Sequence, residues 1–166
     1  DEVVNTFAAK GITLKLEETD AVPTDGKYTK NYDIIPGTTL AKDPKVTASC
    51  DTDYFVFVKL TKSADWDDDV LKYEIAEGWT ELTEAPLKDG EKVYYKDLTS
   101  DNKLEGVSVL KDDQVVIPNT VTASDMPATA PTLTVKAYAI QQINGTDTDG
   151  KNTKFTALDA WNEVSK

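Results

Sequence analysis

The chain has 166 residues, a length that suits one domain with a buried core of its own. Its formal net charge of −12 argues against phosphate backbones and anionic lipid surfaces as partners, so neither nucleic acid nor membrane binding is expected. All 18 basic residues are Lys and the chain has no His. Ser-His-Asp and Cys-His catalysis are therefore excluded, and a zinc site would lack imidazole ligands.

Residues 1–7 form a short apolar stretch ahead of the first core strand, which is expected over residues 11–16. The stretch carries Val3, Val4, Thr6 and Phe7. An N-terminal strand of this kind has two uses: it closes the sheet of its own subunit, or it adds to the open edge of a neighbouring copy and builds a polymer. The residues alone leave both uses open, together with a third alternative in which the terminus is frayed and pairs with neither sheet.

Alternation with a period of two dominates the rest of the chain and predicts β-strands. Residues 54–60 are apolar on both faces until Lys59, which favours a central strand. Residues 107–110 and 114–117 are separated by three residues, a spacing typical of a hairpin. Residues 133–143 form a long strand that places Leu133, Val135, Ala137 and Ala139 on one face.

Two short helices are expected, one turn over residues 122–126 and a longer helix over residues 156–164 that Thr156 would cap. Roughly nine short strands separated by turn signals predict an all-β fold, a β-sandwich with one or two short helices. A jelly-roll topology is favoured over an immunoglobulin-like one, because the chain has no Cys…Trp…Cys pattern.

The remaining candidates for chemistry have ordinary structural interpretations. Cys50 is the single cysteine and is expected to be a small buried hydrophobe. The segment Asp147-Thr148-Asp149-Gly150 lacks the other ligands of a calcium loop, and the acidic run over residues 65–69 is expected to be solvated. The expectation is therefore no catalytic residue, no metal site and no cofactor. The three tryptophans are expected to pack in or around the core rather than to bind sugars: Trp66, Trp79 and Trp161.

A set of short segments in a fixed order resembles the TasA/camelysin-type exported proteins of Gram-positive bacteria. These segments are DEVVNTF (1–7), IIPG (34–37), KDP (42–44), DYFVFVK (53–59), EGW (77–79), VYY (93–95), VKAYAIQ (135–141) and ALDAW (157–161). The resemblance spans almost the whole chain. Each segment is short, and their order carries the resemblance.

The resemblance implies a jelly-roll domain over residues 11–166 preceded by an N-terminal donor-strand segment, residues 1–10. It implies export after cleavage near the present N-terminus, which fits a chain that starts at Asp1 without Met. TasA-like members form biofilm matrix fibres in which the N-terminal strand of one subunit completes the sheet of the next. The matching residues here are Val3, Val4, Thr6 and Phe7. The metalloprotease activity attributed to camelysin-like members is not carried over, because no His is present.

Three hypotheses follow. The first is a secreted, non-enzymatic subunit of an extracellular matrix filament at the cell surface, whose partner is a further copy of itself added head-to-tail by donor-strand complementation. The second is a monomeric cell-surface module that recognises glycan or a host protein through the loops at residues 63–70 and 144–152. The third is an enzyme that relies on carboxylates alone, since acids are the only plausible catalytic groups.

Overall fold

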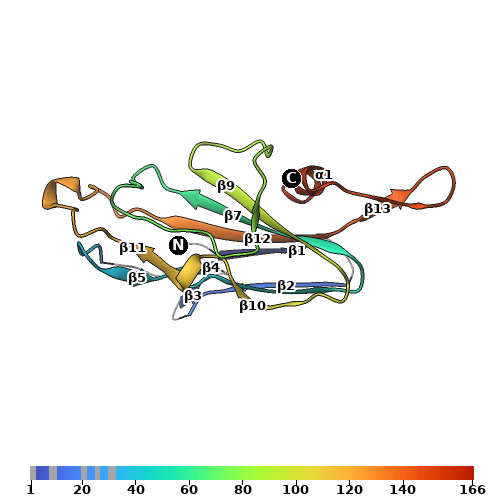
Figure 1. The fold of residues 1–166 in the computed structure, drawn as a ribbon, viewed down its shortest axis with the longest axis horizontal. Helices are drawn as coiled ribbons and strands as arrows, with labels where there is room; N and C mark the ends of the chain where they lie inside the picture. Colours follow the sequence, from blue (N-terminus) through green and yellow to red (C-terminus); the bar gives the residue numbers. More distant parts are fainter. Residues whose placement is uncertain (1–2, 8–10, 20–21, 25–26, 30–32) are drawn as a thin grey trace.

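The protein is an all-β sandwich, as the computed structural model shows (Figure 1), and one α-helix lies among the residues that the structure describes. The structure describes residues 3–7, 11–19, 22–24, 27–29 and 33–166. The all-β sandwich expected from the sequence is confirmed, and the jelly-roll topology stays a prediction.

The larger layer is a five-stranded sheet in the order β1-β12-β7-β9-β8. Its strands are β1 (Val3–Phe7), β12 (Leu133–Gln141), β7 (Tyr54–Lys62), β9 (Glu91–Leu98) and β8 (Thr80–Glu81). The strand that the sequence placed centrally, β7, pairs with β12 on one side and β9 on the other. Among the described strands of this sheet, β1 alone pairs in parallel, and all other pairs are antiparallel.

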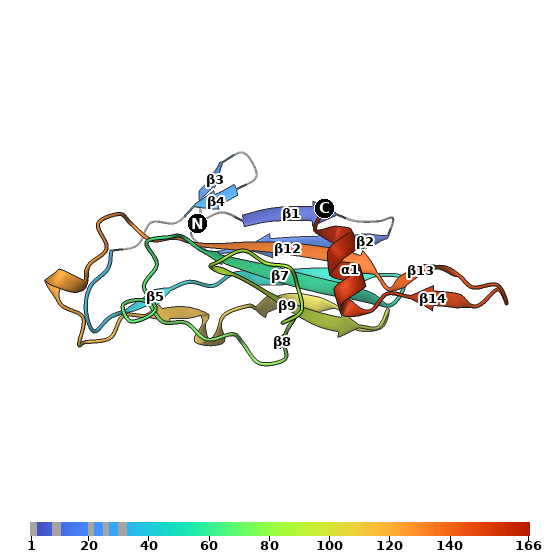
Figure 2. The same cartoon turned by 90° about the horizontal axis from the view of Figure 1, so that it is seen from above.

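The facing layer has three strands in the order β10-β6-β2. They are β10 (Leu104–Ser108), β6 (Lys45–Cys50) and β2 (Ile12–Glu17). Three two-stranded pieces complete the fold, and Figure 2 shows that the β13–β14 piece extends beyond the sandwich. These pieces are β5 (Thr39–Ala41) with β11 (Gln114–Val116), β3 (Val22–Thr24) with β4 (Lys27–Thr29), and β13 (Ile143–Thr146) with β14 (Asn152–Lys154).

Two apolar clusters explain why β7 is apolar on both faces. Tyr54, Val56, Val58 and Leu60 face the three-stranded layer and join the main core. The intervening Phe55 and Phe57 join a second cluster under α1 (Ala157–Val164). Burial of both faces is what a central strand covered on each side requires.

The second cluster is built around Trp161, which is 3% exposed. Its ring lies 5.5 Å from that of Phe57 and 5.2 Å from that of Tyr138, edge-on in the second case. Thr156 caps α1 by accepting a hydrogen bond from the Asp159 N–H, as the sequence predicts. The one-turn helix expected near residue 124 is present as the 3-10 turn Ala123–Asp125.

The hairpin expected from residues 107–117 is wrong. β10 pairs with β6, whereas β11 pairs with β5 in a different sheet. Between them, the 3-10 turn Lys111–Asp113 redirects the chain, and the Val109 N–H donates to the Pro44 carbonyl instead of to β11. The long strand expected over residues 133–143 is also shorter, because β12 ends at Gln141 and Ile143 starts β13.

Candidate functional site

The N-terminal strand singled out by the sequence lies at the edge of the five-stranded sheet. Val3 stands opposite Val135 and Phe7 opposite Ala139, with Val4 and Thr6 at the positions between. The predicted polymerisation residues thus form one continuous strand along β12. The rest of the predicted donor segment, residues 1–2 and 8–10, lies outside the described residues.

In this structure β1 completes the sheet of its own subunit. This arrangement is one of the two uses that the sequence left open. Alternate residues of β12 that stand opposite β1 are fully buried: Val135, Ala137 and Ala139 are each at most 1% exposed. They belong to the main core, so the edge that β1 covers is continuous with the interior of the sandwich.

The connection from β1 to the facing layer is short. Three residues separate Phe7 from Gly11, and a chain of this length spans at most about 14 Å. β2 contacts β1 and runs back from this connection (Figure 2). Gly11 has a φ of +88°, a conformation that residues with a side chain rarely adopt.

The two ends of the sandwich are therefore defined by β1. We call the end beside the β1–β2 connection the hinge end; it holds Phe7, Ile12 and Gln141. The opposite end, called the far end, holds Val3, Glu17 and Leu133. Nine residues of β12 separate these ends, a distance of about 27 Å.

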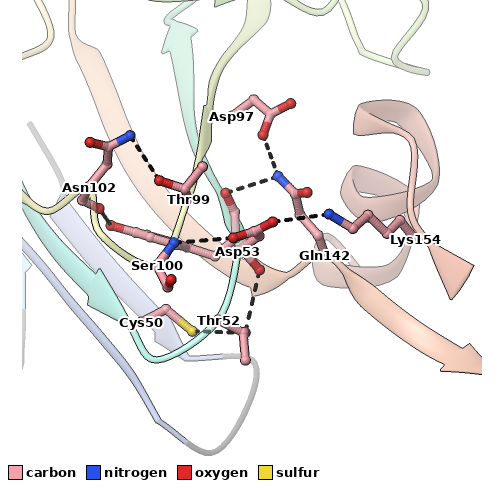
Figure 3. Close-up of polar contacts among 10 residues, drawn as sticks. Cys50, Thr52, Asp53, Asp97, Thr99, Ser100, Asn102, Gln142 and Lys154 are labelled. Atoms are coloured by element: carbon pink, nitrogen blue, oxygen red, sulfur yellow. Dashed lines mark hydrogen bonds and ion pairs between the residues drawn. The ribbon is translucent and has the colours of Figure 1, made fainter. Parts of the chain in front are cut away.

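A polar cluster closes the hinge end (Figure 3). The Asp53 carboxylate accepts hydrogen bonds from the Ser100 N–H at 3.2 Å and from the Lys154 ammonium at 3.0 Å. The Lys154 and Ser100 bonds both lower the pKa of Asp53. Gln142, which is buried, donates to Asp97 and so links the end of β12 to β9.

Tyr54 fills the same end from inside. Its hydroxyl donates to the Asn102 carbonyl at 2.7 Å and lies 3.2 Å from the Ala48 carbonyl. Burial, reinforced by nearby Cys50, raises the pKa of Tyr54 to about 12. Cys50 is a buried free cysteine, as expected from the sequence. The bond from Tyr54 to Ala48 links β7 of the larger sheet to β6 of the facing layer at this end.

The far end contains a buried ion pair. The Lys42 ammonium lies 3.2 Å from a Glu18 carboxylate oxygen, and the two side chains are 3% and 0% exposed. Burial lowers the pKa of Lys42, and the Glu18 carboxylate opposes that shift. Nothing in the sequence pattern marks this pair, because Lys42 and Glu18 are 24 positions apart.

The candidate cation loops use their carboxylates to hold their own backbone. Asp147 Oδ1 accepts from the N–H groups of Asp149 and Lys151, and Asp67 Oδ1 accepts from the Asp69 N–H. Among the described residues, no group of three or more potential ligands could hold a metal ion. Within the same described part of the chain, no helix is long and apolar enough to cross a membrane.

The two loops expected to form a binding surface lie at opposite ends of the sandwich. The loop at residues 63–70 follows Lys62, which pairs with Leu133 at the far end. The loop at residues 144–152 follows the hinge end of β12. Trp79 and Trp161 are buried, and Trp66 packs edge-on against Tyr73 with 5.8 Å between ring centroids. The two loops therefore do not form one site, and no row of exposed tryptophans exists for sugar stacking.

Comparison of the chain with protein-family models, with curated proteins and with solved structures gave no match in any of the three.

Proposed function

We propose that this protein is a secreted structural subunit of an extracellular matrix filament that polymerises head-to-tail by donor-strand complementation. In this proposal β1 leaves its own sheet and completes the five-stranded sheet of a neighbouring copy. The acceptor is the edge of β12, with the buried row Val135, Ala137 and Ala139 behind it.

One observation carries the proposal. β1 is a five-residue edge strand paired with β12, and three residues connect it to the next described residue of the chain. Among the described strands β1 pairs only with β12, so its release would leave the other pairs of the sheet in place and would uncover the buried row of β12. Loss of β1 would leave an unpaired strand edge on β12, which a strand from another copy can satisfy with backbone hydrogen bonds of its own.

The experiment is negative-stain electron microscopy of the full-length protein beside a variant that lacks residues 1–7. Filaments are expected only from the full-length protein. A deletion variant that also fails to fold would be uninformative, so circular dichroism and addition of a synthetic peptide of residues 1–7 accompany it. Monodisperse particles from both proteins, or filaments from both, would contradict the proposal.

A further inference from the structure

The direction of β1 decides the kind of assembly that strand exchange can produce. β1 runs parallel to β12, so its last residue, Phe7, lies at the hinge end beside Ala139. The connection to Gly11 also belongs to the hinge end, because it reaches at most about 14 Å. A released β1 therefore remains tethered to the hinge end of its own subunit.

Parallel insertion into a neighbour would bring two hinge ends together. Phe7 of the donor would again lie at the hinge end of the acceptor, and the tether would hold the donor's own hinge end within about 14 Å of it. The acceptor's displaced strand would leave at the same place, where the vacant site of the donor is within equal reach. Exchange then closes into a two-fold pair and cannot grow.

Antiparallel insertion has the opposite outcome. Phe7 of the donor would lie at the far end of the acceptor, beside Val135, so the hinge end of each subunit would face the far end of the next. A growing chain of subunits then keeps one unused donor strand at one end and one unpaired β12 edge at the other end. That contact is heterologous and remains open, which is the requirement for a filament.

We propose that in the filament β1 reverses its direction and runs antiparallel to β12 of the neighbouring subunit. This inference rests on the proposed function, and it names the orientation, the register and the two surfaces that meet. Val3 of the donor then stands opposite Ala139 of the acceptor, Asn5 remains opposite Ala137, and Phe7 stands opposite Val135.

The sequence of β1 accepts this reversal. Its order is Val3-Val4-Asn5-Thr6-Phe7, with an apolar residue at each end and Asn5 in the centre. Reversal about the Asn5 and Ala137 pair still places an apolar residue opposite each of Val135 and Ala139. Odd-numbered residues of β1 also remain opposite odd-numbered residues of β12, so the alternation between the two faces of the sheet is kept.

The sheet gives a reason for the reversed strand to be preferred. β1 forms the one parallel pair among the described strands of the five-stranded sheet, and reversal would make this sheet antiparallel throughout. Antiparallel pairing is slightly more stable per residue than parallel pairing. An exchange into another parallel pair would reproduce the pairing of the isolated subunit and would give no gain in free energy. Reversal to an antiparallel pair would make the free energy of the polymer lower than that of the isolated subunit.

Disulfide trapping between single-cysteine subunits tests the orientation. In a Cys50→Ala background, Val3→Cys subunits are co-assembled with Ala139→Cys subunits, and in a matched reaction with Val135→Cys subunits. Opposed residues of an antiparallel pair have Cα atoms about 4.5–5.5 Å apart, within the range of a disulfide. After oxidation of washed filaments, a covalent dimer is expected with Ala139→Cys and none with Val135→Cys.

Each other outcome has one meaning. A dimer with Val135→Cys would overturn the reversal while leaving strand exchange intact. Filaments that cross-link with neither variant would overturn both the reversal and the assignment of β12 as acceptor. Absence of filaments from the wild-type protein would overturn the proposed function itself. Because Val135 and Ala139 are core residues, strand direction is also read in wild-type filaments by cryo-electron microscopy, which needs no substitution.

Discussion

At the scale of single residues, Gly11 is a turn residue directly before β2, four positions after the last residue of β1. Its φ of +88° lies in the left-handed region, which costs a residue with a side chain roughly 1–2 kcal/mol. Gly11→Ala should therefore weaken the closed arrangement of β1 and shift the equilibrium toward strand exchange by about ten-fold. We expect filaments at a lower protein concentration, measured by light scattering and confirmed by microscopy.

Gly106→Ala is the matched control for this change. Gly106 has a φ of +60°, its surroundings leave open space for a methyl group, and it lies in β10 away from β1. It should lower the free energy of unfolding without changing the concentration at which filaments form. Equal assembly by Gly11→Ala and the wild type would show that the turn does not limit exchange.

The buried pair of Lys42 and Glu18 lies at the far end of the sandwich. Lys42→Met removes the cation 3.2 Å from a carboxylate that is fully buried. Loss of one partner of a buried ion pair typically costs about 3–5 kcal/mol, and replacement of both partners by apolar residues is often neutral. Urea unfolding should therefore show a large decrease in the free energy of unfolding for Lys42→Met. The double variant Lys42→Met with Glu18→Leu should recover most of it. A decrease below about 1 kcal/mol for Lys42→Met would contradict this role of the pair.

At the scale of elements, Asp53 joins the β13–β14 hairpin to the sandwich through its ion pair with Lys154. The pKa of Asp53 lies below the ordinary value for an aspartate because the charged carboxylate accepts hydrogen bonds from Lys154 and Ser100. A lowered pKa in the folded state means that the contribution to stability is fully present above about pH 4, the ordinary range of an aspartate, and is lost as pH falls through the folded value. Stability should therefore decrease with acidification in this window.

Asp53→Asn measures this contribution. The difference in free energy of unfolding between the wild type and the variant should be constant near neutral pH and should shrink below about pH 4. Denaturant unfolding at a series of pH values records it. A difference that did not change with pH would show that the charge of Asp53 has no part in holding the hairpin.

The elements that the sequence predicted well are those whose signal is local. β7 is apolar on both faces because it is covered by β2 and β6 on one side and by α1 on the other, and Thr156 marks the start of α1. Pairing partners are not local. Residues 107–117 have the spacing of a hairpin, yet their partners β6 and β5 lie more than 50 positions earlier. The strand over residues 1–7 was foreseen, whereas its parallel partner β12 was not.

The same distinction applies to the candidate site. Alternation identified Val135, Ala137 and Ala139 as one face of a strand, and the structure buries all three. The polar cluster at the hinge end joins Asp53, Asp97, Gln142 and Lys154, which are scattered over about 100 positions and share no motif. Gly11 was expected to start the strand over residues 11–16, whereas the structure places it in a turn before β2 (Ile12–Glu17) with a φ of +88°.

At the scale of the whole molecule, the net charge of −12 opposes contact between identical subunits. The Debye length falls from about 30 Å at 0.01 M salt to about 8 Å at 0.15 M, so added salt should weaken this repulsion. We expect filament elongation, followed by light scattering, to be faster at about 0.15 M sodium chloride than at about 0.01 M. The free energy of unfolding, measured in the same buffers, separates an effect on assembly from one on folding. Slower elongation at higher salt would contradict a contact limited by charge repulsion.

The most direct test of strand exchange is to lock β1 in its own sheet and then release it. Val3→Cys with Val135→Cys, in a Cys50→Ala background, joins two residues that stand opposite each other in the isolated subunit. Oxidised as a monomer, this protein should form no filaments under the microscope, and reduction of the same sample should restore them. Filaments from the oxidised protein, with the disulfide shown to be intact, would contradict polymerisation by β1.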